Sequence, residues 1–155
     1  MIRLKDVEME YDNGTRAIKG ITLTIEDGEF VFLVGPSGSG KSTLLHMLGG
    51  LDRPTSGSVT VDGREIFQLK DEELTIFRRR KIGFVFQNYN LVPVLNVYEN
   101  IVLPIRLDGK VEDRAYVEQI IATLGLEKKL QSLPNQLSGG QQQRVAIARA
   151  LAAGA

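Results

Sequence analysis

The sequence predicts an α/β fold with an N-terminal β region, a partial parallel core sheet and a helical subdomain. Residues 30–34 and 82–86 are short apolar runs next to glycine, which is typical of strands buried on both faces of a parallel sheet. Helical periodicity follows after residue 40 and again from about 112 to 124. The 155 residues are enough for one domain with a sizeable core.

The first 35 residues predict β structure. Ile21, Leu23 and Ile25 alternate with polar residues, as in a half-buried strand. Asp-Asn-Gly at 12–14 and Asp-Gly at 27–28 are turn signals. A short strand at 59–61 with a turn at 62–63, and a helix at 71–80, are expected next.

The second half predicts helices. Residues 88–110 show no clear period and contain two prolines. From about 112 to 124, one helical face carries apolar residues and Gly125 fits the C-cap. That face comprises Val117, Ile120, Ile121 and Leu124. Ser138 and Gln141 form a capping-box pair, so a last helix is expected to start there.

The composition excludes several classes of function and of binding site. Lys+Arg and Asp+Glu both number 19, so no broad nucleic-acid binding is indicated, and the basic residues 78–81 suit a solvated helix end. No Cys and a single His exclude a disulfide framework and a Cys- or His-cluster metal site. No apolar run approaches the roughly 20 residues of a membrane span. A cytoplasmic protein that reaches a membrane only through a partner is therefore expected.

Residues 35–42 match the phosphate-loop pattern G-x-x-x-x-G-K-[ST] in full. Glycines let successive backbone N–H groups approach phosphates, Lys41 adds positive charge, and the Ser42 hydroxyl can ligate Mg²⁺. The following helix directs its positive end at the anion. The predicted nucleotide-binding residues are Gly35, Pro36, Ser37, Gly38, Ser39, Gly40, Lys41, Ser42 and Thr43.

A second glycine motif, Leu-Ser-Gly-Gly-Gln at 137–141, lies at a helix start. On physical grounds it is either a second anion site or only a well-capped helix. Together with the phosphate loop and the run QQRVAIARAL, it resembles the ATP-binding cassette (ABC) family of P-loop proteins. The resemblance implies a cassette that binds ATP and Mg²⁺ and dimerises head to tail with a second cassette. Ser138, Gly139, Gly140 and Gln141 would then contact the ATP held by the other protomer.

The resemblance assigns two further residues. Tyr11 occupies the place of the adenine-stacking aromatic, with a plain surface or core tyrosine as the alternative. Gln87 matches the glutamine loop, which makes it a Mg²⁺ ligand that orients water; Lys41 and Gln87 are the residues predicted to take part in catalysis. The implied subdivision is 1–87 for the β region and phosphate-loop core, 88–136 for the helical subdomain and 137–155 for the signature helix.

Short matches indicate a branch of the family. Residues 50–57, 80–87 and 89–93 resemble cassettes of lipoprotein-release and macrolide-export transporters. Residues 12–14 and 28–35 also resemble the cell-division cassette, which stays an alternative. The resemblance implies integral membrane permease partners at the inner face of the plasma membrane. The apolar residues Tyr89, Leu91, Val92, Leu95 and Val97 either dock on such a subunit or pack over the helical subdomain.

The sequence stops at Ala155, before the place where the family has its adjacent Asp and Glu, its dimer-contact loop and its switch histidine. We therefore expect ATP binding without hydrolysis by this chain alone. The core sheet would be incomplete, and residues 30–34 would expose an apolar edge, so a marginally stable or aggregation-prone chain is expected.

Three other functions are weighed against a transporter ATPase subunit. A soluble ABC-type ATPase acting on DNA or ribosomes usually carries long insertions or tandem cassettes, which are absent here. The Leu-Ser-Gly-Gly-Gln segment argues against a small-molecule P-loop kinase. A non-catalytic ATP-binding fragment stays open for the chain as it stands.

Overall fold

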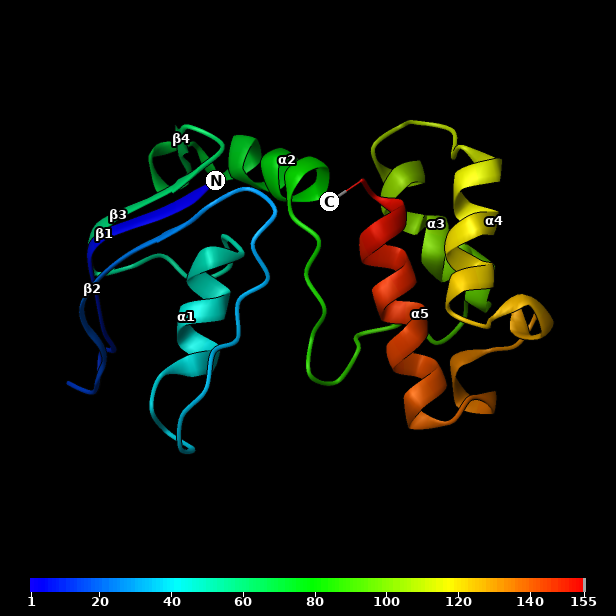
Figure 1. The fold of residues 1–155 in the computed structure, drawn as a ribbon, viewed down its shortest axis with the longest axis horizontal. Helices are drawn as coiled ribbons and strands as arrows, with labels where there is room; N and C mark the ends of the chain where they lie inside the picture. The colour runs from blue at the N-terminus through cyan, green and yellow to red at the C-terminus, as the bar shows by residue number, and fades with distance from the viewer. Residues whose placement is uncertain (155) are drawn as a thin grey trace. The chain divides into compact units, whose positions relative to one another are not determined.

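The computed structural model describes residues 1–154. The chain divides into two compact units, Met1–Thr75 and Ile76–Ala155. The first unit holds the sheet and the phosphate loop (Figure 1), and the second is mainly helical. Helix α2 (Asp71–Lys81) crosses the division. The predicted subdivision at 87–88 and 136–137 stays a prediction, and each unit is described by itself.

The sheet of the first unit has the strand order β2-β1-β3-β4, and every described strand pair is antiparallel. Its strands are β1 (Ile2–Glu10), β2 (Arg16–Ile25), β3 (Ser56–Val61) and β4 (Arg64–Glu65), followed by the short 3-10 helix η1 (Ile66–Gln68). The predicted half-buried strand around 21–25 and the strand at 59–61 are confirmed. The turn at 62–63 is also confirmed, since both of its residues have positive φ.

Helix α1 (Lys41–Leu48) lies beside the sheet and contacts β2 (Figure 1). Leu44 and Met47 are its buried residues. The strands contribute apolar side chains to the core of this unit, namely Leu4, Val7, Ile18, Val59 and Val61. Burial of these side chains stabilises the unit by about 1.5–3 kcal/mol for each large residue.

The predicted strands at 30–34 and 82–86 are wrong for this structure, because neither segment has a strand partner among the described residues. A strand is stabilised by hydrogen bonds to a neighbour, so an apolar run with no neighbour stays irregular. Instead of being buried, Phe30, Phe32 and Val34 are 85%, 78% and 83% exposed. The sequence analysis also expected residues 30–34 to lack a neighbouring strand and to expose apolar residues, and this exposure agrees with that expectation.

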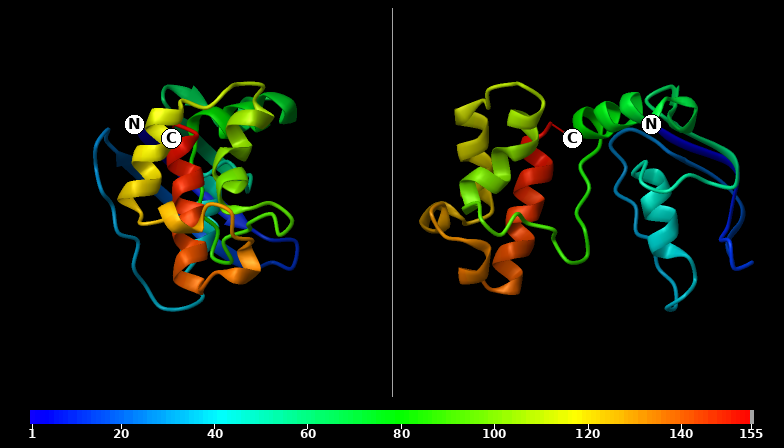
Figure 2. Two further views of the ribbon diagram at one scale, coloured as in Figure 1. Left: turned by 90° about the vertical axis from the view of Figure 1, so that its right-hand side faces the viewer. Right: turned by 180° about the vertical axis from the view of Figure 1, so that it is seen from behind.

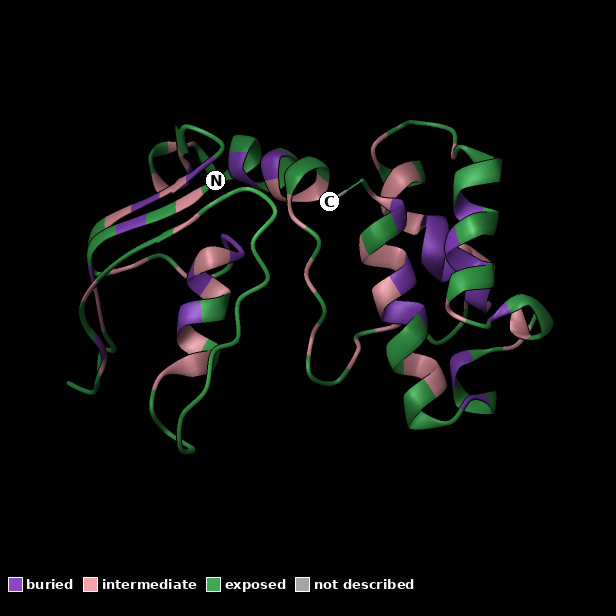
Figure 3. Ribbon diagram, viewed as in Figure 1, coloured by how far each residue is buried: buried purple, intermediate pink, exposed green. Residues whose placement is uncertain are grey.

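The second unit packs three main helices around one apolar cluster. They are α3 (Val97–Leu107), α4 (Arg114–Thr123) and α5 (Gly139–Ala152), with short 3-10 helices at Glu127–Lys129 (η2) and Pro134–Gln136 (η3). Both views of Figure 2 show α3, α4 and α5 side by side. The faces that they turn toward one another are buried (Figure 3). The predicted helices at 112–124 and after Ser138 are confirmed, and Gly125 has the positive φ of a C-terminal glycine.

The sequence did not predict helix α3, because Pro104 lies inside it. Proline removes one backbone hydrogen bond but is tolerated when packing supports the rest of the helix. Asn96 caps this helix by accepting a hydrogen bond from the Glu99 N–H at 2.8 Å. The pair of Asn96 and Glu99 was the available signal for this helix.

Candidate functional site

The glycines of loop 35–42 lie where a larger side chain would be strained or would clash. Gly38 and Gly40 have φ values of 81° and 92°. A Cβ on Gly40 would lie 2.5 Å from the Ala17 carbonyl oxygen, and one on Gly35 would lie 2.9 Å from the Ser39 hydroxyl. The loop therefore keeps its backbone uncovered, as close approach to a ligand requires.

The Lys41 ammonium lies within the curve of this loop. Its Nζ donates hydrogen bonds to the carbonyl oxygens of Gly35 and Pro36 at 2.6 and 2.8 Å. A third contact joins Nζ to the Ser39 hydroxyl at 3.3 Å. The loop thereby fixes the position of the positive charge while the charge remains close to the exposed surface. An anion at this loop would meet a lysine that is already in place.

Lys41 is the first residue of helix α1, and no side chain caps the N-terminus of this helix. The N-cap is Gly40, which offers no side-chain acceptor, and no acidic residue lies in the first turn. The first N–H groups of a helix lack intrahelical partners and carry a partial positive charge. Ser42 is exposed in this turn, so its hydroxyl is accessible. Lysine, free amides and glycines together form an arrangement that fits a phosphate group.

Tyr11 joins this site from the connection between β1 and β2. Its phenolic oxygen lies 2.9 Å from the hydroxyl of Thr43 in α1. The Tyr11 side chain is also among the exposed large side chains of the chain. Its hydroxyl is thus held beside the start of α1 while the side chain stays partly exposed, which agrees both with adenine stacking and with a plain surface tyrosine.

A ligand that carries phosphate groups is what these residues fit. The described residues contain no group of three or more His, Cys, Asp or Glu side chains that could hold a metal ion. Mg²⁺ usually keeps few protein ligands and is bound mainly by phosphate oxygens and water. The exposed Ser42 hydroxyl suits such a role, whereas an all-protein metal site is not supported by the residues that the structure describes.

Gln87, in the second unit, lies at the corner of a tight turn. The Tyr89 N–H donates to the Phe86 carbonyl oxygen at 3.0 Å, which closes a turn around Gln87 and Asn88. Tyr89 and Asn90 then adopt positive φ values of 64° and 54°. The Gln87 side chain is exposed.

The segment after Gln87 packs against the helical unit. Leu91 contacts the apolar cluster of α3, α4 and α5, and Val97 is part of that cluster. Tyr89, Val92 and Leu95 are half-buried. These contacts support packing over the helical subdomain as the role of this apolar segment.

The signature segment forms the start of α5. The Gln141 N–H donates to the Ser138 hydroxyl at 3.2 Å, and the Ser138 N–H donates to the Gln141 side chain at 2.9 Å. This capping box is the one that the sequence predicts. Gly139 and Gly140 are exposed, and a Cβ on either would meet nothing within 4 Å. Their N–H groups lie in the first turn, where a helix supplies no acceptor.

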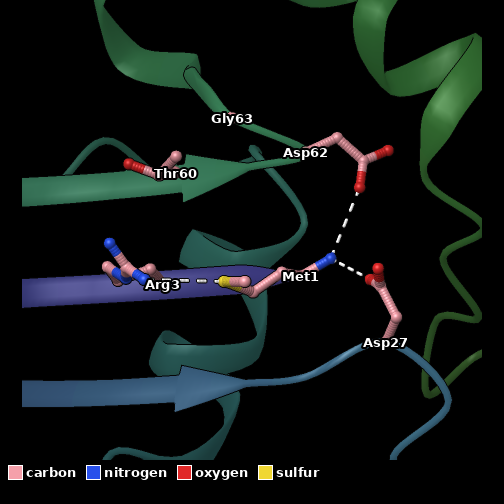
Figure 4. Close-up of a pocket in the computed structure, with 6 residues that line it drawn as sticks. All are labelled: Met1, Arg3, Asp27, Thr60, Asp62 and Gly63. Atoms are coloured by element: carbon pink, nitrogen blue, oxygen red, sulfur yellow. Dashed lines mark hydrogen bonds and ion pairs between the residues drawn. The ribbon is translucent and has the colours of Figure 1, made fainter.

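A separate cavity lies elsewhere in the first unit (Figure 4). It has a volume of about 480 Å³ and is lined by Met1, Arg3, Asp27, Thr60, Asp62 and Gly63. The Met1 ammonium lies between the two aspartates, contacts Asp27 and is 3.4 Å from an Asp62 oxygen. The hydrogen bond with Asp27 holds the pKa of this amine above its usual value. No residue of loop 35–42 lines this cavity.

Two residues that support the site were missed by the sequence analysis. Asn100 is fully buried, and its side chain bonds both the N–H and the carbonyl of Val92 at 2.8 and 3.1 Å. Arg149 donates to the carbonyl oxygens of Tyr89 and Asn90. The Arg149 contacts span 59 and 60 positions, and the Asn100 contact spans eight without following a helical or strand period, so neither leaves a local sequence signal.

Comparison with known proteins places these motifs in a family. The family model for ABC transporters matches residues 18–155. An uncharacterised ABC transporter ATP-binding protein of Thermotoga maritima is 50% identical over 98% of this chain and 67% of its own length. The lipoprotein-releasing system ATP-binding protein LolD of Geobacter metallireducens is 46% identical over 97% of the chain and 69% of its own length.

Other relatives are much longer than this chain. The macrolide export ATP-binding/permease protein MacB of Bdellovibrio bacteriovorus is 46% identical over 97% of the chain, which spans only 24% of MacB.

Among solved structures, the dimeric cassette MJ0796 superimposes with a TM-score of 0.92 at 48% identity, over 99% of this chain and 70% of that one. A post-hydrolysis form of MJ0796, bound to ADP and Pi, gives a TM-score of 0.91 at 47% identity.

Proposed function

The chain belongs to the ABC transporter family, and we propose that it is the ATP-binding part of a cassette that powers a membrane permease. The loop 35–42 carries this proposal. The glycines at 35, 38 and 40, the Lys41 ammonium within the curve of the loop and the open N-terminus of α1 form a phosphate-binding arrangement. Gly35, Pro36, Ser37, Gly38, Ser39, Gly40, Lys41, Ser42 and Thr43 would bind the phosphates.

When bound, Mg²⁺ would neutralise negative charge on the phosphates. Lys41 would exchange part of its contacts with Gly35 and Pro36 for phosphate oxygens. The Ser42 hydroxyl and the Gln87 side chain are the proposed Mg²⁺ ligands. Tyr11 would stack on the adenine, and its bond to Thr43 would orient the ring.

A second cassette is the proposed partner at the signature segment. Two exposed glycines in a helix lower its stability relative to alanine, and nothing within this chain crowds them. A ligand that approaches the N–H groups closely from outside would explain both glycines. We propose that Ser138, Gly139, Gly140 and Gln141 contact ATP on the other protomer of a head-to-tail dimer. MJ0796 is a dimeric cassette, which supports this arrangement.

The transport process follows from the relatives. LolD is named as part of a lipoprotein-releasing system and MacB as a macrolide exporter. We propose that this cassette drives export or lipoprotein release through integral permease subunits. Among the described residues, no helix is long and apolar enough to cross a membrane. We also propose that contact with the inner face of the plasma membrane runs through the permease, as the family's permease partners suggest.

A second candidate is an ATP-binding module that does not hydrolyse ATP. Phosphate-loop hydrolases need a carboxylate behind Mg²⁺ as well as a phosphate cradle. Binding and turnover separate the two candidates.

The test measures Mg²⁺-ATP binding by calorimetry and phosphate release by the purified chain, for wild type, Lys41→Ala and Lys128→Ala. Lys128 is exposed in η2 of the second unit and serves as the matched control. We expect wild type and Lys128→Ala to bind ATP and Lys41→Ala to lose binding, with no phosphate release by any of them. Equal binding by Lys41→Ala would refute the proposed site. Release by wild type above Lys41→Ala would refute the non-hydrolytic candidate.

A further inference from the structure

Arg149 of α5 makes a two-pronged contact with the backbone that follows Gln87. Its Nη2 donates to the Tyr89 carbonyl oxygen at 2.9 Å, and its Nη1 donates to the Asn90 carbonyl oxygen at 3.0 Å. Arg149 has no carboxylate partner among the residues that the structure describes. Its guanidinium is half-buried, and burial lowers its pKa below the usual value. The partly buried Arg149 guanidinium therefore forms hydrogen bonds with two backbone carbonyl oxygens and no ion pair among the described residues.

Those two oxygens belong to a strained backbone. Tyr89 and Asn90 are consecutive non-glycine residues with positive φ. Such a conformation is uncommon for a bulky aromatic residue and persists only where the surroundings hold it. The planar guanidinium offers two N–H groups in a fixed fork, which suits two neighbouring carbonyl oxygens. Arg149 therefore supplies the side-chain contact to the carbonyl oxygens of this pair, beside the backbone bonds of the turn.

Hydrogen bonds connect Arg149 to the turn that contains Gln87. Arg149 holds the Tyr89 carbonyl, and the Tyr89 N–H closes the turn on Phe86 at 3.0 Å. Gln87 occupies the corner of that turn. On the other side, the buried Asn100 side chain fixes Val92 through both its N–H and its carbonyl. The segment from Gln87 to Val92 is thus held at two points, and the one nearer to Gln87 is Arg149.

We propose that Arg149 is a positioning residue, which fixes the backbone of Tyr89 and Asn90 and thereby the place of Gln87. The proposal rests on the proposed function for its consequence, because Gln87 is there a Mg²⁺ ligand. Arg149 lies on the same helix as the signature residues. A displacement of α5 would accordingly be passed to the turn that carries Gln87.

The first experiment does not depend on nucleotide. Hydrogen–deuterium exchange is measured for the peptide 86–92 in wild type, Arg149→Lys and Arg144→Lys. The lysine keeps the charge but cannot reproduce the fork, whereas Arg144 of the same helix makes only one 3.5 Å contact, with the Leu124 carbonyl. Arg149→Lys is expected to exchange roughly 2- to 10-fold faster, the equivalent of one net hydrogen bond. Arg144→Lys is expected to match wild type.

The second experiment measures the consequence for Gln87. ATP affinity is compared with Mg²⁺ and with EDTA for wild type, Arg149→Lys, Gln87→Ala and the double variant. The Mg²⁺-dependent gain is expected to fall roughly 10-fold in Arg149→Lys, as when support of a metal ligand is lost. The double variant should lose no more than Gln87→Ala alone, because both changes act on one element. Affinity in EDTA should stay at the wild-type value.

The outcomes separate the two proposals. Unchanged exchange of 86–92 in Arg149→Lys would overturn the positioning role whatever ATP does. Faster exchange with an unchanged Mg²⁺ effect would also overturn it, because Gln87 would then keep its place without Arg149. Failure of wild type to bind ATP would refute the proposed function alone, and exchange would still decide the role of Arg149. Circular dichroism checks folding, and Arg149→Gln replaces the lysine variant if that variant does not fold.

Discussion

The phenolic oxygen of Tyr11 and the hydroxyl of Thr43 lie 2.9 Å apart, which ties the connection between β1 and β2 to the first turn of α1. The contact brings together two positions 32 residues apart in the chain. It places an aromatic ring beside the phosphate loop. The contact is a hydrogen bond between two hydroxyl groups, so the hydroxyl and the ring of Tyr11 can be tested separately.

Tyr11→Phe removes the hydrogen bond and keeps the ring, whereas Tyr11→Ala removes both. We expect the Phe variant to bind ATP nearly as wild type does, with a loss of at most about 1 kcal/mol in the free energy of unfolding. The Ala variant should lose about 1–3 kcal/mol of ATP binding, the usual worth of stacking on a base. Calorimetric titration measures both, with Tyr116→Ala in the second unit as the control. Equal affinities of all variants would assign Tyr11 a purely structural role.

Gly139→Ala and Gly140→Ala should make the chain more stable and less able to associate. A Cβ meets no atom within 4 Å at either position, and neither glycine has positive φ. Alanine in α5 should therefore raise the free energy of unfolding by up to about 1 kcal/mol. It should also weaken ATP-dependent dimerisation, because the added methyl group separates the helix from the ligand. Urea unfolding and sedimentation velocity measure the two effects.

The control for these variants is Gln143→Ala, since Gln143 is exposed on the same helix outside the signature. It should change neither quantity by much. If Gly139→Ala dimerises with ATP at the same protein concentration as wild type does, this result would argue against ATP contact at this helix start.

Asp108 should make stability depend on pH in the acid range. Its carboxylate is 5% exposed and contacts Lys110 at 3.0 Å, Arg79 at 3.0 Å and Arg80 at 3.1 Å. The hydrogen bond from Lys110, followed by that from Arg80, lowers its pKa to about 2. A lowered folded-state pKa gives stability that is complete above the unfolded value of 3.8 and is lost as pH falls toward about 2.

The measurement is the urea midpoint between pH 5 and pH 2. Asp108→Asn should remove part of the decline below pH 4 and lower the midpoint at pH 7. Glu112, whose pKa is also lowered to about 2, first by its hydrogen bond with Arg106, adds to the decline in the same window. Glu118→Gln changes a carboxylate that is largely exposed and serves as the control. If the urea midpoint of Asp108→Asn falls with pH as steeply as that of wild type, Asp108 does not contribute to the pH dependence of stability.

The apolar segment 30–34 should make the chain associate. Phe30 and Phe32 pack only edge to face against one another, with ring centroids 5.0 Å apart, and both are largely exposed. Exposed apolar runs without charge are typical aggregation sites. Replacing both by serine should reduce light scattering at high concentration without lowering the unfolding midpoint, because neither ring lies in the core. Monomeric wild type with a cooperative thermal transition would contradict this prediction.

Much of the candidate site was predictable because its contacts are local. The bonds of Lys41 to Gly35 and Pro36 span six and five positions, and the capping box of Ser138 and Gln141 spans three. Such contacts are encoded by spacing in the sequence. The same holds for the turn glycines and for the apolar face of α4, whose period the sequence displays.

The tertiary structure alone decided the rest, because hydrogen bonds between distant segments leave no periodic signal. Residues 30–34 and 82–86 have the composition of buried strands, yet a strand forms only beside a neighbour, and neither has one among residues 1–154. Arg149 likewise looks like any helix arginine in the sequence. Its role follows from contacts 59 and 60 positions away, which exist only once α5 has packed in the helical unit.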